Sequence, residues 1–394
     1  MKRTRFSRRG GLTRDAEQLI QLAQGLANAG GRLEAGWWES QLNALIEKLL
    51  RNRNDDALSA ALDRLYETGG RAYDAAADLI EAGSESGAIK PDTEGAPARD
   101  ALLIAAPVLA WSRYAISSGP LNETTLAGLK AQLHGHVLAA NTELALADFL
   151  WSPDQLPRGY AETFELTKRL ALSASRGQNL HIEAANLPET TPFLSDLRYV
   201  VGVVIAPHGA PIFRWQEEGS TPESVAAQWT QQGGSVLASV FPACAIEPVL
   251  PDAYHAACRQ GDRASRPYSL KASVAFLQTT LSIMASDLRV VIAPFHDRRL
   301  EEYRIGFTLR QQPDVVHGVV WPLLDAEDET TDVAGQIEAV LREAGVGQII
   351  NLEQRFPMEY CDDCGAPLYP DPEGEPVHAE MPDEEDGTRP AHLH

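Results

Sequence analysis

Long apolar runs and an export signal are both missing from this chain of 394 residues. The longest apolar run, residues 101–111, is too short to cross a bilayer as a helix and contains Pro107. Bases stand near the N-terminus, but no apolar stretch follows them as it does in a signal peptide. We therefore expect a cytoplasmic protein without membrane contact. In that compartment the four cysteines should be reduced unless a metal binds them.

Positive charge is also scarce, since 55 acidic residues outnumber 34 basic ones and the net charge is −21. Binding to phosphates needs a positive face, so this balance argues against a general nucleic-acid-binding protein. The exception is the segment 1–12, which we expect to form a disordered basic arm. This arm is either a solvated tail or a contact for RNA or another anionic partner. Its bases are Lys2, Arg3, Arg5, Arg8 and Arg9.

Signatures of catalysis and nucleotide binding are absent too. The chain has no GxxxxGK[ST] or GxGxxG sequence, so a standard phosphate-binding loop is not indicated. HExxH, GxSxG and the zinc-deaminase pattern are missing as well. The sequence therefore names no catalytic residue.

The chain does contain the periodic patterns of a mixed α/β protein with several parts. Apolar residues recur at helical spacing between Thr13 and residue 83, and glycine pairs separate the segments, which indicates a small helical bundle. A polar stretch rich in glycine and proline follows and indicates a linker. We expect a helical bundle over 13–83, a linker over 84–100, α/β modules over 101–160, 161–260 and 261–355, a cysteine knuckle over 356–370 and an acidic disordered tail over 371–394.

An internal repeat is the basis for the three modules. The strand-like runs 102–107, 201–207 and 289–294 all end in Ala-Pro, and each is followed by a helical segment and another apolar run. The order helix–strand–strand–helix–strand fits a ferredoxin-like split βαβ unit that lacks its first strand. We therefore predict tandem ferredoxin-like-type modules, in which the preceding copy could supply the missing strand.

Cys361 and Cys364 form the one compact motif that suggests specific chemistry. Two thiolates separated by two residues can bind one metal ion, and Gly365 permits the tight turn that follows. A structural zinc ion needs four ligands, and His378 is a candidate for the third. The sequence has no second CxxC, so the fourth ligand is open: His392, His394, Cys244, Cys258 or a partner chain. A redox pair and a reduced structural pair are the alternatives to a zinc knuckle.

A second group of polar residues lies just beyond the repeated strands. Strand ends of α/β modules often carry binding sites, so Arg214, His296 and residues 297–299 could bind an anion. Arg113, Arg214 and Arg304 occupy comparable places in the repeats and could line a shared cleft, or they could be solvated at sheet edges. The simpler interpretation is that they belong to polar turns, because no glycine-rich loop accompanies them. The residues are Arg113, His208, Arg214, His296 and Arg304. His134 and His136 are best explained as the ordinary charge complement of a helix C-terminus.

Both ends of the chain carry a family resemblance. Residues 13–17 (Thr-Arg-Asp-Ala-Glu), with Leu26 and Ala27 behind them, and residues 355–365 (Arg-Phe-Pro-Met-Glu-Tyr-Cys-Asp-Asp-Cys-Gly) resemble an uncharacterised bacterial family, a domain of unknown function. The resemblance covers essentially the whole chain and implies a bacterial cytosolic protein. It supplies no catalytic residue.

Three functions remain in competition. The first is a non-enzymatic binding or regulatory protein with a structural zinc knuckle, whose ligand is a protein or a small molecule. The second is a metal-dependent enzyme resembling a hydrolase. The third is an RNA- or ribosome-associated factor that acts through the basic arm.

Overall fold

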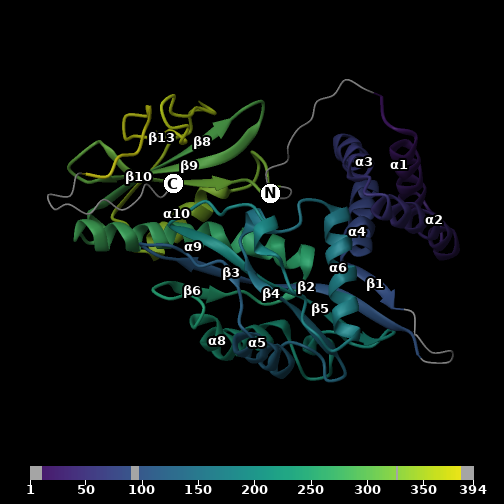
Figure 1. Cartoon of the computed structure of the whole chain (residues 1–394). Coiled ribbons are helices and arrows are strands. Elements are labelled where there is room, and N and C mark those ends of the chain that lie inside the picture. Colours follow the sequence, from purple (N-terminus) through teal and green to yellow (C-terminus); the bar gives the residue numbers. More distant parts are fainter. Residues whose placement is uncertain (1–10, 90–96, 325–326, 383–394) are drawn as a thin grey trace.

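A computed structural model describes residues 11–89, 97–324 and 327–382. The chain is a mixed α/β protein, as predicted, with a helical bundle at the N-terminus and two larger sheets (Figure 1). In the described part of the chain, no helix is both long enough and apolar enough to cross a membrane.

The N-terminal bundle contains four helices, as the helical spacing predicted. Thr13 caps the first, because its hydroxyl accepts a hydrogen bond from the Ala16 N–H (3.2 Å). Leucine and alanine side chains from all four helices share one core. The helices are α1 (Arg14–Ala27), α2 (Arg32–Arg51), α3 (Asp55–Thr68) and α4 (Arg71–Glu85).

The first sheet has the order β1-β2-β5-β4-β3, and β6 and β7 pair with β2 beside β1. The central strands β2 and β5 are buried on both faces, which explains why they are nearly continuous apolar runs in the sequence. The strands are β1 (Ser86–Ile89), β2 (Arg99–Trp111), β3 (Gly119–Pro120), β4 (Glu143–Trp151), β5 (Ser195–Pro207), β6 (Ala245–Pro248) and β7 (Asp252–Ala253).

Strands of the first two predicted copies of the repeat interleave in this sheet. β2 and β5 pair antiparallel along their whole length, with Leu103 opposite Val203, which occupy the same position relative to Pro107 and Pro207. β4, from the first copy, pairs with β5, whereas β6, from the second copy, pairs with β2. The predicted boundary at residue 160 therefore separates strands that pair with one another. Each copy completes its sheet with strands of the other, so neither buries its apolar faces alone.

Helices cover both faces of the first sheet. α5 and the segment from α7 to α8 pack on one face, and α6 and the first half of α9 pack on the other (Figure 1). These helices are α5 (Glu123–His136), α6 (Tyr160–Ser175), α7 (Pro222–Gln228), α8 (Gly234–Ala238) and α9 (Tyr254–Leu281). A π-helical turn, Trp229–Gly233, joins α7 to α8, and 3-10 turns lie at Pro153–Gln155, Ala184–Asn186, Arg214–Gln216 and Ala285–Asp287.

Helix α9 connects the two sheets. Its first half packs on the first sheet through Tyr254 and Ala257, and its second half packs on the second sheet through Leu270, Val274 and Leu277. Figure 1 shows α9 between the sheets, and the predicted boundary at residue 260 falls inside it. The second sheet has the order β10-β9-β8-β11, with β12 also on β8. Its elements are β8 (Leu288–His296), β9 (Leu300–Leu309), β10 (Val315–Pro322), α10 (Val333–Glu343), β11 (Gln348–Asn351) and β12 (Phe356–Pro357).

The C-terminal segment differs from the predicted disordered tail. Residues 371–382 lie against the second sheet, where Glu380 N–H donates to Val315 O (2.9 Å) and Met381 packs on the core. A small hairpin joins the segment to the residues before it, because β14 (Pro376–Val377) pairs with β13 (Tyr369–Pro370). Its composition indicated disorder, but the buried side chain of Tyr369 and backbone hydrogen bonds hold it in place. The acidic residues 383–394 lie outside the described part of the chain.

Candidate metal centre

The two cysteines lie on a tight turn between β12 and β13. Gly365 N–H donates to Cys361 O, and Cys361 N–H donates to Ala366 O, both at 2.8 Å. Gly365 has a φ of +72°, in the left-handed region that glycine adopts without strain. The sequence Cys-Asp-Asp-Cys-Gly therefore closes a loop that turns both thiols toward the same place.

His378 reaches this loop because the β13–β14 hairpin folds back. Asp371 closes the hairpin, since its side-chain oxygen accepts hydrogen bonds from the N–H groups of Glu373 (3.0 Å) and Glu375 (2.8 Å). His378 follows β14 directly, and its Nδ1 lies 3.9 Å from the Cys364 sulfur. The ligand atoms of Cys361, Cys364 and His378 all lie within 4.8 Å of one another, near enough to hold one metal ion.

The electrostatics of the loop favour metal binding. The backbone N–H groups of Cys364 and Asp363 point at the Cys361 sulfur and lower the pKa of its thiol. A thiolate is the form that binds metals, and two sulfurs with one imidazole are a donor set that suits zinc. The group contains three ligands among the described residues, and Cys244 and Cys258 are not part of it. His392 and His394, the other predicted ligands, lie outside the described residues.

Arg304, on β9, holds the cysteine turn in place through hydrogen bonds. Its side chain is fully buried, and its Nη1 donates to the carbonyl oxygens of Glu359 (2.5 Å) and Leu368 (2.9 Å), one on each side of the cysteine turn. Its Nε donates to Glu302 (2.7 Å), and its guanidinium lies over the ring of Tyr360. We predicted Arg304 as a ligand-binding residue, but its guanidinium is occupied by these contacts, which hold the cysteine turn.

Two glycines make room for the hairpin on the second sheet. Gly306 and Gly318 are cross-strand partners on β9 and β10. A Cβ atom at Gly306 would overlap the carbonyl oxygen of Pro370, and one at Gly318 would overlap the ring of Tyr369. Only a surface without side chains at these two positions lets β13 approach the sheet this closely.

Substituting Gly318 with alanine should therefore weaken docking of the C-terminal segment. We expect a loss of about 1–3 kcal/mol in the free energy of unfolding, the usual cost of an overpacked contact. Urea denaturation measures this loss, and limited proteolysis reports release of the segment. Gly87→Ala is the matched control, because Gly87 is also in a strand and a Cβ there meets nothing within 4 Å. Equal stability of the two variants would contradict the proposed docking.

The other predicted ligand-binding residues do not meet in one place. Arg113 and His208 are exposed beside the first sheet, where His208 pairs with Asp100 at 2.9 Å and the contact raises the pKa of the imidazole. Arg214 donates to the carbonyl oxygen of His134, at the end of α5 (3.2 Å). His296 ends β8 in the second sheet, with its Nε2 3.7 Å from Glu329. A cleft shared by Arg113, Arg214 and Arg304 stays a prediction that this geometry does not support.

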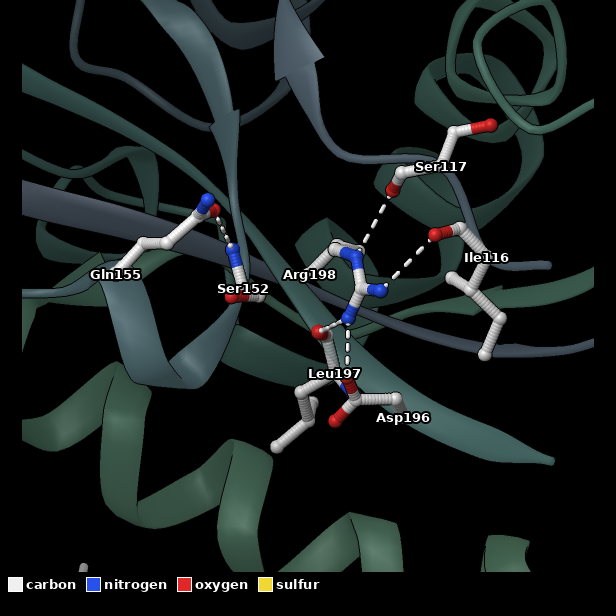
Figure 2. Close-up of polar contacts among 7 residues, drawn as sticks. All are labelled: Ile116, Ser117, Ser152, Gln155, Asp196, Leu197 and Arg198. Atoms are coloured by element: carbon white, nitrogen blue, oxygen red, sulfur yellow. Dashed lines mark hydrogen bonds and ion pairs between the residues drawn. The ribbon is translucent and has the colours of Figure 1, made fainter. Parts of the chain in front are cut away.

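Sequence reasoning missed Arg198, the buried arginine of the first sheet. Figure 2 shows its guanidinium donating to the carbonyl oxygens of Ser117 (2.8 Å) and Ile116 (3.0 Å) and pairing with Asp196. Arg198, on β5, thereby holds the loop that follows β2. The signal was a repeated tetrapeptide, Ser-Asp-Leu-Arg, at 195–198 and again at 286–289. In the second copy Arg289 likewise ties a loop, through Gln312 O (2.9 Å).

Comparison with known proteins adds a family and no further relative. No curated protein and no solved structure matches the chain significantly. One family model matches residues 4–392, nearly the whole chain and both ends of the predicted resemblance. The chain therefore belongs to the family described as "Protein of unknown function (DUF2863)".

Proposed function

We propose that this chain is a non-enzymatic, cytoplasmic binding or regulatory protein whose C-terminal segment is fastened by a structural zinc ion. Cys361, Cys364 and His378 are the proposed ligands. The observation that carries the proposal is the convergence of their donor atoms within 4.8 Å, although 14 to 17 residues separate the cysteines from the histidine.

A structural role suits the surroundings of the three ligands. The cysteine turn and the hairpin are short, so a cross-link between them would stabilise the segment in addition to the burial of Tyr369. Arg304 and the two glycines attach the same segment to the second sheet. A bound ion would therefore hold residues 361–378 as one unit on that sheet.

Zinc binding can be tested on the full chain purified without an affinity tag. We expect elemental analysis to find about one zinc ion per chain, because two thiolates and an imidazole favour zinc over hard cations. The double variant Cys361→Ser/Cys364→Ser should lose the ion. Removing the metal with a chelator should lower the unfolding midpoint, since an ion bound to the native state stabilises it.

Cys244→Ser is the matched control, because this thiol is also half-buried but lies outside the group. It should keep the metal. Folded wild-type protein that contains no metal and gains no thermal stability from added zinc would contradict the proposal.

A metal-dependent, hydrolase-like enzyme is the second candidate. The observation that favours it is the number of ligands: three in the described part of the chain, as in catalytic zinc sites, where water takes the fourth position. Cobalt substitution separates the two roles. A spectrum that changes when azide is added indicates an open position, whereas an unchanged tetrahedral spectrum indicates four protein ligands.

The third function, contact with RNA through the basic arm, rests on residues 1–10, which lie outside the described residues. It stays a prediction.

A further inference from the structure

A second candidate site, separate from the metal centre, lies where the helical bundle meets the first sheet. A cavity of about 810 Å³ opens there between α6, the end of β4 and the turn from α2 to α3. This volume is in the range of sites for small molecules, which often form between two parts of a protein. Asp55 fixes one corner, because it accepts a hydrogen bond from the Ala161 N–H at the start of α6 (3.0 Å).

Three arginines line this cavity, and each comes from a different piece of chain. Arg53 follows α2, Arg158 precedes α6, and Arg169 lies on α6. Arg53 adopts a left-handed backbone conformation, with a φ of 53°, at the turn that ends α2. Among the residues that the structure describes, none of the three side chains forms an ion pair. Their guanidinium groups are therefore available to an anion, which arginine binds through two parallel hydrogen bonds.

The wall of the cavity offers further groups of complementary chemistry. Trp151 is 4% exposed and lines the cavity, and its indole Nε1 is a buried donor without a partner in the described part of the chain. Because that nitrogen is enclosed, Trp151 offers the cavity ring surface and not a hydrogen-bond donor.

Four carboxylates also line the cavity, and two of them are already engaged. Asp55 and Glu162 accept backbone hydrogen bonds around the start of α6. Asp154 and Glu165 form no hydrogen bond or ion pair within the described residues, so they can accept hydrogen bonds from hydroxyl groups. Leu156, Leu166 and Leu187 supply apolar surface for the body of a ligand.

We propose that this cavity binds a phosphorylated sugar, either free or as part of a nucleotide. The arginines hold the phosphate, and the carboxylates accept from the sugar hydroxyls. This recognition uses side chains, which is consistent with the absence of a glycine-rich phosphate loop from the sequence.

The corresponding turn in the other predicted copy has different surroundings. The sequence Leu-Pro precedes both α6 and α9, at 156–157 and 250–251. At the start of α9, helix α4 makes a contact, because Glu85 accepts a hydrogen bond from the His255 N–H (2.8 Å). At the start of α6, the corresponding turn lines the cavity.

The experiment measures binding of ribose 5-phosphate, AMP and inorganic phosphate to the full chain by calorimetry, with thermal unfolding as a second readout. We expect AMP or ribose 5-phosphate to bind and to raise the unfolding midpoint. Arg158→Ala/Arg169→Ala should weaken that binding by about tenfold or more, since charge-assisted hydrogen bonds are lost. Both arginines are exposed, so the variant should fold normally.

Arg176→Ala is the matched control, because Arg176 is exposed at the end of the same helix but does not line the cavity. It should bind like the wild type. If AMP binds more tightly than ribose 5-phosphate, the ligand is a nucleotide; the reverse order indicates a free sugar phosphate. No binding of either compound, binding that the double variant retains, or equal affinity for inorganic phosphate would overturn the proposal.

Discussion

Replacing Arg304 with leucine should release the cysteine loop and lower the free energy of unfolding by about 3–5 kcal/mol. The side chain is fully buried, so its loss leaves Glu302 without its charged partner and removes the donor shared by Glu359 O and Leu368 O. Urea denaturation measures the stability, and protease cleavage between residues 357 and 382 reports the freed loop. Zinc affinity should fall in parallel, because the same two carbonyl groups flank the cysteines.

Two further variants make this test specific. Arg304→Lys keeps the charge, but a lysine ammonium cannot reproduce the fork that reaches Glu302 and both carbonyl groups, so it should recover only part of the stability. Arg310→Ala removes an exposed arginine just beyond the end of the same strand and should be nearly neutral. If Arg304→Leu behaved like Arg310→Ala, the bracing role would be wrong.

Replacing Glu85 with glutamine should change how the stability of the protein depends on pH. Glu85 ends α4 and is half-buried beside α9, and this partial burial raises the pKa of its carboxyl from 4.5 to about 7. The native state therefore binds more protons than the unfolded state between these two values, so the contribution of Glu85 to stability falls as pH rises through this window. We compare the free energy of unfolding of the glutamine variant with that of the wild type. The difference, variant minus wild type, should be about 3 kcal/mol larger above pH 7 than below pH 4.5.

The difference between variant and wild type is the informative quantity, because a neighbour acts in the opposite direction. Burial lowers the pKa of His255 from 6.5 to about 4, so its contribution to stability rises with pH over that range. The two effects partly cancel in the wild type between pH 4.5 and 6.5. Glutamine can still accept the His255 N–H, and Glu39→Gln, at an exposed position on α2, controls for loss of a charge. Parallel pH profiles for Glu85→Gln and the wild type would refute the assignment.

The candidate metal centre was partly predictable, because its first half is local in sequence. The spacing of Cys361 and Cys364, with Gly365 after them, specifies a turn that brings two sulfurs together whatever the rest of the chain does. His378 was a plausible third ligand by proximity alone. Its position depends on the hairpin, and the hairpin depends on Gly306 and Gly318, far back in the sequence. No local pattern links those glycines to the cysteines.

Arg304 was predicted to bind a ligand, and Arg198 was missed, for the same reason. Arginine is usually exposed, so the sequence gives no ground for expecting either side chain to be buried. The tertiary structure instead buries these two guanidinium groups, because backbone carbonyl groups of distant loops need donors there. Burial of this kind leaves little trace in the sequence beyond the repeated Ser-Asp-Leu-Arg.

The sequence by itself determined the helices of the N-terminal bundle, the buried strands and the cysteine turn. Helical spacing, caps such as Thr13 and continuous apolar runs act over a few residues, so they can be read without the fold. Only the tertiary structure decided that the two copies interleave in one sheet, that α9 joins both sheets and that Arg53, Arg158 and Arg169 share a cavity. These features depend on contacts between distant segments, and burial by those segments also sets the pKa of Glu85.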